Sequence, residues 1–169
     1  RREGKIEFLG GKAELIKLGA LDDVDIAMLT HTEASSSATG RIGVGATNNG
    51  MVAKRIRFEG VAAHAGGAPH AGVNALNAAN IALTAINAQR ETFRDEDTIR
   101  VHPIITLGGV AVSSVPADVR METFVRGRTV EAFLSASKKV DRALRAGAMS
   151  VGGKVTITTL PGYLPIRHA

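Results

Sequence analysis

The feature that most constrains this chain is the order of six periodic segments that follow Asn49. Segments 52–59, 98–107, 119–128 and 154–160 are predicted strands, whereas 74–90 and the stretch from Thr129 to Gly152 repeat apolar residues at helical spacing. The order is therefore strand, helix, strand, strand, helix, strand. This order predicts an α+β, ferredoxin-like βαββαβ fold, in which two helices cover one face of a four-stranded antiparallel sheet.

With both helices on one face, the other face of the sheet must meet water, a ligand or another domain. The first predicted strand shows the alternation well, because Val52, Ile56 and Phe58 oppose charged residues, with Lys54 out of phase. The basic residues expected on the open face are Arg55, Arg57, Arg100, Arg120, Arg126 and Lys154. A solvated surface and a ligand-binding surface are both compatible with this set.

The residues before Asn49 follow a different pattern. Residues 12–18 predict a short helix that Gly19 ends, and the unbroken apolar run 26–29 predicts a strand covered on both faces. A covered strand needs a larger sheet around it. We therefore expect residues 1–46 to be a fragment of an α/β domain with its linker, residues 47–161 to be the ferredoxin-like domain, and residues 162–169 to begin the return to the first domain.

Composition narrows the classes of partner. The net charge is +5, but aromatic residues make up 4% of the chain and Trp is absent, so a ferredoxin-like sheet here lacks the exposed aromatics that stack RNA bases. The absence of cysteine excludes disulfides, thiolate zinc sites and cysteine nucleophiles from these residues. No apolar run approaches the roughly 20 residues that cross a bilayer. We expect a soluble, cytoplasmic protein with no nucleic-acid or membrane partner.

Five histidines are the first candidates for chemistry. His31 directly follows the predicted covered strand, where a ring can bind a metal or make a structural hydrogen bond. His64 and His70 lie in a glycine-rich loop before a helix, a position that favours function. No H-E-x-x-H or H-x-D motif occurs, so the sequence shows no complete metal site.

Several spaced motifs resemble a known family. They are Phe58-Glu59-Gly60-Val61-Ala62-Ala63-His64-Ala65-Gly66, the segment 72–78, Gly108-Gly109 and Val115-Pro116-Ala117-Asp118. Together they resemble the dimerisation, or lid, domain of the aminoacylase/carboxypeptidase family of zinc-dependent amidohydrolases, in the branch of hippurate hydrolase-like and aminobenzoyl-glutamate hydrolase-like proteins. Residues 11–31 look like the stretch between the paired catalytic glutamates and a metal-binding histidine, and 162–165 like the return to the catalytic domain.

The resemblance implies roles for four residues. His31 matches a histidine that binds one metal of a two-metal centre, and His64 matches a lid histidine that crosses the dimer and stabilises the scissile carbonyl or its oxyanion, a role typically worth about 3–4 kcal/mol. Arg126 resembles an arginine that pairs with the substrate carboxylate. Ser113 stands where family members usually carry Asn, a departure that bears on which substrate is bound.

The resemblance also implies cofactors and partners. The full-length parent is expected to bind two divalent metal ions, zinc or else manganese or cobalt, with none stably held by this fragment. We expect a homodimer formed through the lid domain and a small amide substrate that carries a carboxylate. The edge strand and the helix 74–90 are the surfaces suited to pairing.

Three alternatives remain open at this point. A regulatory amino-acid-binding ferredoxin-like domain needs no metal, but it leaves the placement of His64 unexplained. A nucleic-acid-binding domain is supported only by charge. A non-catalytic dimerisation scaffold of the same family is kept open by Ser113.

We predict that the 169-residue chain alone is catalytically inert, because the catalytic glutamates and most metal ligands of the family are not among its residues. Metal ions activate the water and a glutamate moves the proton, so neither step can occur without them. The check is an assay of N-acyl amino acid hydrolysis by the purified chain with added zinc. Measurable turnover would contradict the prediction.

Overall fold

A computed structural model describes residues 11–30, 45 and 47–167, and the chain divides into two compact units, Arg1–Gly43 and Val44–Ala169. The second unit carries the predicted fold. Its strands are β1 (Gly50–Glu59), β2 (Arg100–Val101), β3 (Ile104–Leu107), β4 (Asp118–Gly127) and β5 (Lys154–Tyr163). Its α-helices are α2 (Ala75–Ala88) and α3 (Val130–Ser150), and 3-10 turns lie at Pro69–Ala71, Arg90–Thr92 and Asp95–Asp97.

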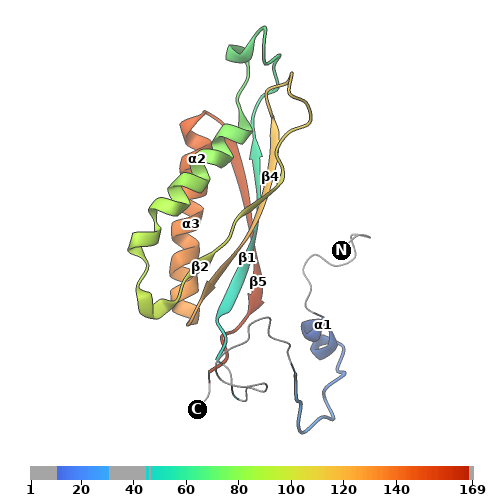
Figure 1. Cartoon of the computed structure of the whole chain (residues 1–169). Coiled ribbons are helices and arrows are strands. Elements are labelled where there is room, and N and C mark those ends of the chain that lie inside the picture. The colour runs from blue at the N-terminus through green and yellow to red at the C-terminus, as the bar shows by residue number, and fades with distance from the viewer. Residues whose placement is uncertain (1–10, 31–44, 46, 168–169) are drawn as a thin grey trace. The chain divides into compact units, whose positions relative to one another are not determined.

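The strands form one open antiparallel sheet. Their order across the sheet is β2-β4-β1-β5, and β3 also pairs with β4, beyond the end of β2. Figure 1 shows α2 and α3 side by side on one face of this sheet, and both helices contact β1 and β4. The α+β ferredoxin-like fold predicted from the sequence is therefore confirmed.

Two details of the strands differ from the prediction. The expected strand 98–107 is broken at His102 and Pro103, because proline has no N–H to give to the ladder. The last strand does not stop at Leu160 but runs on to Tyr163, with Pro161 opposite Val52 next to a register shift. Proline is tolerated there because β5 is an edge strand of the sheet.

Side-chain caps and small residues place the two helices. Asn74 Oδ1 accepts the N–H groups of Leu76 and Asn77, and Thr129 Oγ1 accepts that of Ala132. Such caps typically contribute about 1 kcal/mol each. A Cβ on Gly147 of α3 would lie only 2.7 Å from the Cβ of Ala82, so the helices approach at a contact that only small residues allow.

Among the described residues, the buried charged residue in the core between sheet and helices is Lys54. Lys54 alternates with the exposed residues of β1, so its side chain points to the helix side of the sheet. This position agrees with the sequence pattern, in which Lys54 is the charged residue out of phase with the others. Lys54 Nζ donates to Thr159 Oγ1 at 2.8 Å and forms an ion pair with Asp141 Oδ1 at 2.6 Å. The Lys54 side chain is 0% exposed and that of Asp141 22%, so α3 supplies the charge that permits this lysine to be buried.

The described part of the first unit contains a single short helix. This helix, α1 (Lys12–Lys17), ends as expected before Gly19, whose φ of 73° is left-handed. The apolar run 26–29 forms neither helix nor strand, contrary to the predicted covered strand. A covered strand needs partners on both sides, and no strand pairs with this run within the described ranges.

No helix among the described residues of the chain is long and apolar enough to cross a membrane.

The second unit has two distinct ends. At the base, Asn48 and Ile166 exchange both backbone hydrogen bonds, so the chain enters and leaves the unit side by side. At the tip, residues 60–72 and 108–117 project beyond the sheet, as Figure 1 shows at the top of the view. β1 runs from base to tip, and β4 returns from tip to base.

We expect Asp141→Ala to destabilise the chain by about 3 kcal/mol, because it leaves Lys54 buried without its counter-charge. Arg142→Ala, on the exposed side of the same helix, is the matched control and should change stability by less than about 0.5 kcal/mol. Urea unfolding followed by circular dichroism measures both. Equal losses in the two variants would show that the ion pair does not stabilise the core.

Candidate functional site

The tip is a two-stranded ribbon that continues from β1 and β4. The Gly60 N–H donates to the Ala117 carbonyl at 2.8 Å, and the Val115 N–H donates to the Ala63 carbonyl at 2.9 Å. Further out, His64 pairs with Ser114, and the Ala65 N–H donates to the Ser113 carbonyl at 2.8 Å. The ribbon therefore brings the His64 and Ser113 segments together, although they are far apart in the sequence.

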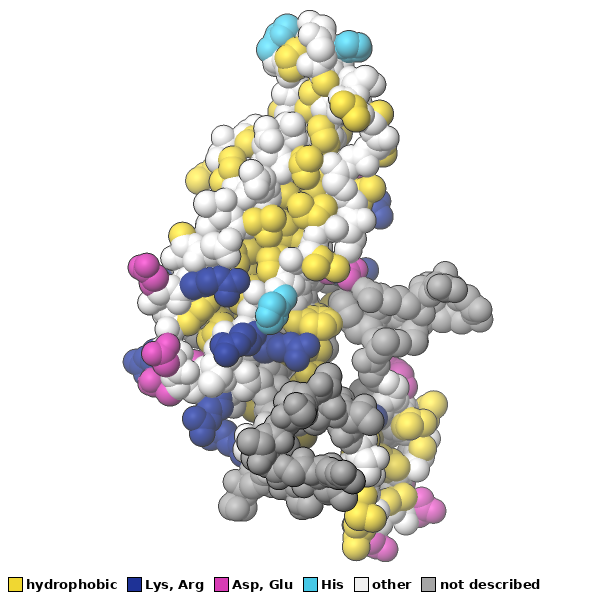
Figure 2. Space-filling view, viewed as in Figure 1, with side chains coloured by type: hydrophobic (Ala, Val, Ile, Leu, Met, Phe, Trp, Pro, Cys, Tyr) yellow, Lys and Arg dark blue, Asp and Glu magenta, His cyan; other side chains and the backbone are white. Residues whose placement is uncertain are grey.

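The orientation and the tautomer of His64 are set by the turn that follows it. The Gly67 N–H donates to His64 Nδ1 at 2.8 Å, so Nδ1 acts as the acceptor. In the neutral imidazole the proton then resides on Nε2, on the opposite side of an exposed ring. The side chain thus presents one N–H donor outward from a rigid turn, which is what stabilisation of a carbonyl oxygen requires. In Figure 2 histidine side chains mark this end of the unit.

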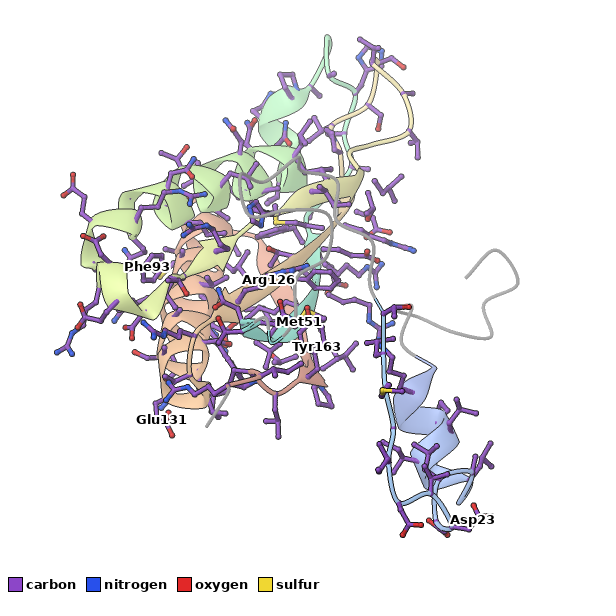
Figure 3. All side chains as sticks on the ribbon, turned by 60° about the horizontal axis from the view of Figure 1, so that its bottom comes forward. Asp23, Met51, Phe93, Arg126, Glu131 and Tyr163 are labelled. Atoms are coloured by element: carbon purple, nitrogen blue, oxygen red, sulfur yellow. The ribbon has the colours of Figure 1, made fainter. Side chains whose placement is uncertain are left out.

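The open face of the sheet carries Arg126 near the base. Its guanidinium carbon lies 5.4 Å from the centre of the Phe124 ring, a cation–π contact. In register with Arg126 are Met51 on one side and Arg100 on the other, and Met51 in turn pairs with Tyr163. Figure 3 shows Arg126, Met51 and Tyr163 following one another across the sheet. Together with Arg100 they form a row that crosses β2, β4, β1 and β5 at the base.

Toward the tip end of the same face, Asp118 binds two arginines. Its Oδ1 accepts from Arg57 Nε at 2.8 Å, and its Oδ2 accepts from Arg120 Nη2 at 3.0 Å. The hydrogen bond from Arg57 is the main cause that lowers the pKa of Asp118 below its usual value. The carboxylate therefore stays ionised down to acidic pH and keeps bridging the two cations.

The structure brings some predicted site residues together and separates others. His64 and Ser113 share the tip, whereas Arg126 lies at the base end of β4. From Asp118 to Arg126 the strand covers about 26 Å, at about 3.3 Å per residue, and His64 lies further out still. His31, the predicted metal ligand, lies outside the described residues. Within those residues no group of three His, Asp or Glu side chains could hold a metal ion.

Two features were not recognised from the sequence as functional. The sequence pattern puts Arg100 on the open face but gives it no role, because only the sheet register brings it beside Arg126. The sequence pattern also favours α2 for pairing, and one further property of α2 supports this. The helix Ala75–Ala88 contains no charged residue, which can be read directly from its sequence.

Comparison with known proteins gives one family. The family model of the peptidase dimerisation domain matches residues 46–151, more than half of the chain. The mouse Xaa-Arg dipeptidase is 30% identical over 148 residues, which cover 88% of this chain and 32% of that protein. One of the p-aminobenzoyl-glutamate hydrolase subunits of Escherichia coli K12 is 33% identical over 135 residues, covering 73% and 26%. The chain thus spans about a third or less of these curated relatives.

Solved structures show the same fold. An aminobenzoyl-glutamate utilization protein from Klebsiella pneumoniae superposes with a TM-score of 0.64 at 20% identity, covering 76% of this chain and 34% of that one. The aminopeptidase PepT from Bacillus cereus gives 0.61 at 22% identity, covering 73% and 32%. In these proteins the matching region is therefore about a third of a longer chain.

Proposed function

The chain belongs to the peptidase dimerisation domain family, and on that premise we propose that it is the dimerisation and lid domain of a metal-dependent amidohydrolase or peptidase. The parent protein would hydrolyse the amide bond of N-acyl amino acids or small peptides. The observation that carries this proposal is the separation of His64 from Arg126 along β1 and β4. Because a small substrate cannot reach both residues in one chain, the proposed site takes them from two chains.

The proposed domain boundaries are residues 1–46 for a piece of the catalytic domain, 47–161 for the lid and 162–169 for the return. The adjacent entry and exit at Asn48 and Ile166 support an insertion of the lid into a longer chain. Such insertions are tolerated where the two ends of a domain lie close together.

Pairing through α2 and the β3 edge is supported by the distribution of charge. The exposed side of α2 carries the uncharged residues Asn77, Asn80, Ile81, Thr84 and Asn87. The exposed side of α3, in contrast, carries Glu131, Lys138, Arg142 and Arg145. Over α2, Figure 2 shows a surface of apolar and uncharged polar atoms. Depletion of charge is a mark of interface cores, so α2 suits a second copy and α3 suits water.

The sheet edge next to α2 supports the same surface. Arg90 Nη2 donates to the Val101 carbonyl of β2 at 3.3 Å, and this bond occupies one acceptor on that strand. β3 presents Ile104 and Ile105, 58% and 39% exposed, at the same edge of the sheet. Antiparallel addition of β3 from a second copy would satisfy this edge and bury both side chains.

In the proposed dimer, each active site combines residues of two subunits. His64 and Ser113 of the partner subunit would reach over the site in which Arg126 binds the substrate carboxylate. The Nε2–H of His64 would donate to the carbonyl oxygen as negative charge develops on it. A divalent metal centre, with His31 as a ligand, belongs to this proposal through the resemblance. The described residues supply no metal site, so no step through the metal is derived. Cytoplasmic location and the absence of nucleic-acid and membrane partners likewise remain predictions.

We expect Ile81→Arg to shift the protein from dimer to monomer, because it places an unpaired charge in an interface core. Leu134→Arg is the matched control, since Leu134 is similarly exposed, 45% against 39%, but lies on α3. Sedimentation velocity on both variants measures the oligomeric state. A monomer produced by the control alone would move the interface to α3.

Mixed dimers of the intact protein test the shared site. His64→Ala should lower activity toward N-acyl amino acids by at least about 100-fold, as loss of an oxyanion donor typically does. Arg126→Gln should lower kcat/KM about 10- to 100-fold, because it removes a charge-assisted hydrogen bond to the substrate carboxylate. Mixing the two variants forms hybrid dimers in which one of two sites has both wild-type residues. Purified hybrid dimers should therefore recover about half the wild-type activity. No recovery in verified hybrid dimers would place both residues in one subunit's site.

A further inference from the structure

The open face of the sheet contains two pairs of arginines that stand directly opposite each other on neighbouring strands. Arg57 on β1 faces Arg120 on β4, and Arg100 on β2 faces Arg126 on β4. Like charges directly opposite in an antiparallel pair repel each other. Each pair therefore needs an anion nearby, or it lowers the stability of the sheet.

The first pair has its anion within the chain. Asp118 accepts from Arg57 at 2.8 Å through one carboxylate oxygen and from Arg120 at 3.0 Å through the other. One carboxylate thus bridges two cross-strand guanidinium groups, an arrangement that suits the planar donor fork of arginine. This contact shows that the face can hold a carboxylate between paired arginines.

The second pair has no such partner among the described residues. The guanidinium carbon of Arg126 lies 5.4 Å from the centre of the Phe124 ring, and Arg100 Nη1 donates to the carbonyl of the neighbouring Ile99 at 2.9 Å. Neither contact supplies negative charge, and no carboxylate of the described ranges lies within 4.0 Å of either guanidinium group. Each arginine has five N–H donors, so most donors of both groups are available to a ligand.

We propose that Arg100 and Arg126 form a carboxylate clamp that binds the free carboxylate of the substrate, as Asp118 is bound by Arg57 and Arg120. The inference rests on the proposed function for the nature of the ligand and assigns Arg100 as a second binding residue. The clamp lies at the base, in the row with Met51 and Tyr163, and Figure 3 shows how Arg126 is placed in that row. The carboxylate end of the substrate is therefore held at the base of one subunit's sheet, away from that subunit's own tip.

Binding of matched ligands to the intact protein tests the clamp. The ligands are levulinate and levulinamide, which have a methylene group in place of the scissile amide N–H of an N-acyl amino acid and differ from each other only in the carboxylate. Calorimetry gives the dissociation constants. Wild type should prefer the acid, and Arg100→Gln should weaken acid binding about 10- to 100-fold, as expected for loss of a charge-assisted hydrogen bond, with little change for the amide. Arg100→Lys, which keeps the charge but not the fork, should give an intermediate loss.

Arg145→Gln is the matched control, because it removes the same charge from the exposed side of α3, behind the sheet. It should leave acid binding within about twofold of wild type, because charges beyond a Debye length are largely screened at physiological salt. If Arg145→Gln weakened acid binding as much as Arg100→Gln does, the loss would come from the overall charge of the protein, and the clamp would be wrong. Unchanged acid binding in both folded Arg100 variants would also overturn the clamp.

The clamp and the proposed function fail in different ways. If the intact protein hydrolyses no N-acyl amino acid while Arg100→Gln still loses acid binding, the proposed activity is wrong and the clamp stands. If hydrolysis is observed and Arg100→Gln has the wild-type KM for acid substrates, the clamp is wrong and the activity stands. A raised KM with little change in kcat supports both.

Discussion

The register between β1 and β4 is the constraint on which the other features depend. From Gly50 opposite Gly127 to Glu59 opposite Asp118, this pairing decides which side chains enter the core and which face outward. A slip of β4 by one residue would turn Arg126 toward the core, and a slip of β1 by one residue would turn Lys54 out of it. The ion pair of Lys54 with Asp141 and its hydrogen bond to Thr159 stabilise the correct register, since a slipped lysine would lose both.

The length of these two strands then shapes the function we propose. The strands β1 and β4, with 10 residues each, hold the tip and the base apart, so His64 and Arg126 face different surroundings. In the dimer that we propose, this separation lets the tip of one subunit reach the base of the other. The same antiparallel geometry places arginines opposite each other, and a carboxylate must resolve their repulsion, from within the chain at one end and from a ligand at the other.

The two helices form one layer on the sheet, but their outer sides differ in charge. Both bury small or apolar residues against the sheet, and the Ala82–Gly147 contact brings them close together. Their outer sides differ, because α2 has no charged residue whereas α3 exposes several. Family membership indicates that the domain pairs. The difference in charge between the two outer sides is the reason we propose α2 as the pairing surface.

The sequence by itself determined the succession of elements, the resemblance to the family, and the identity of His64, Ser113 and Arg126 as candidates, because periodicity and spaced motifs are local properties. The break at Pro103 follows from a proline that the sequence already shows, whereas the continuation of β5 to Tyr163 depends on edge pairing. Only the tertiary structure decided that Lys54 is buried against Asp141, that His64 and Ser113 meet while Arg126 lies far away, and that Arg100 stands beside Arg126. These contacts join residues that are distant in the sequence, and pairing across strands, not local pattern, sets them.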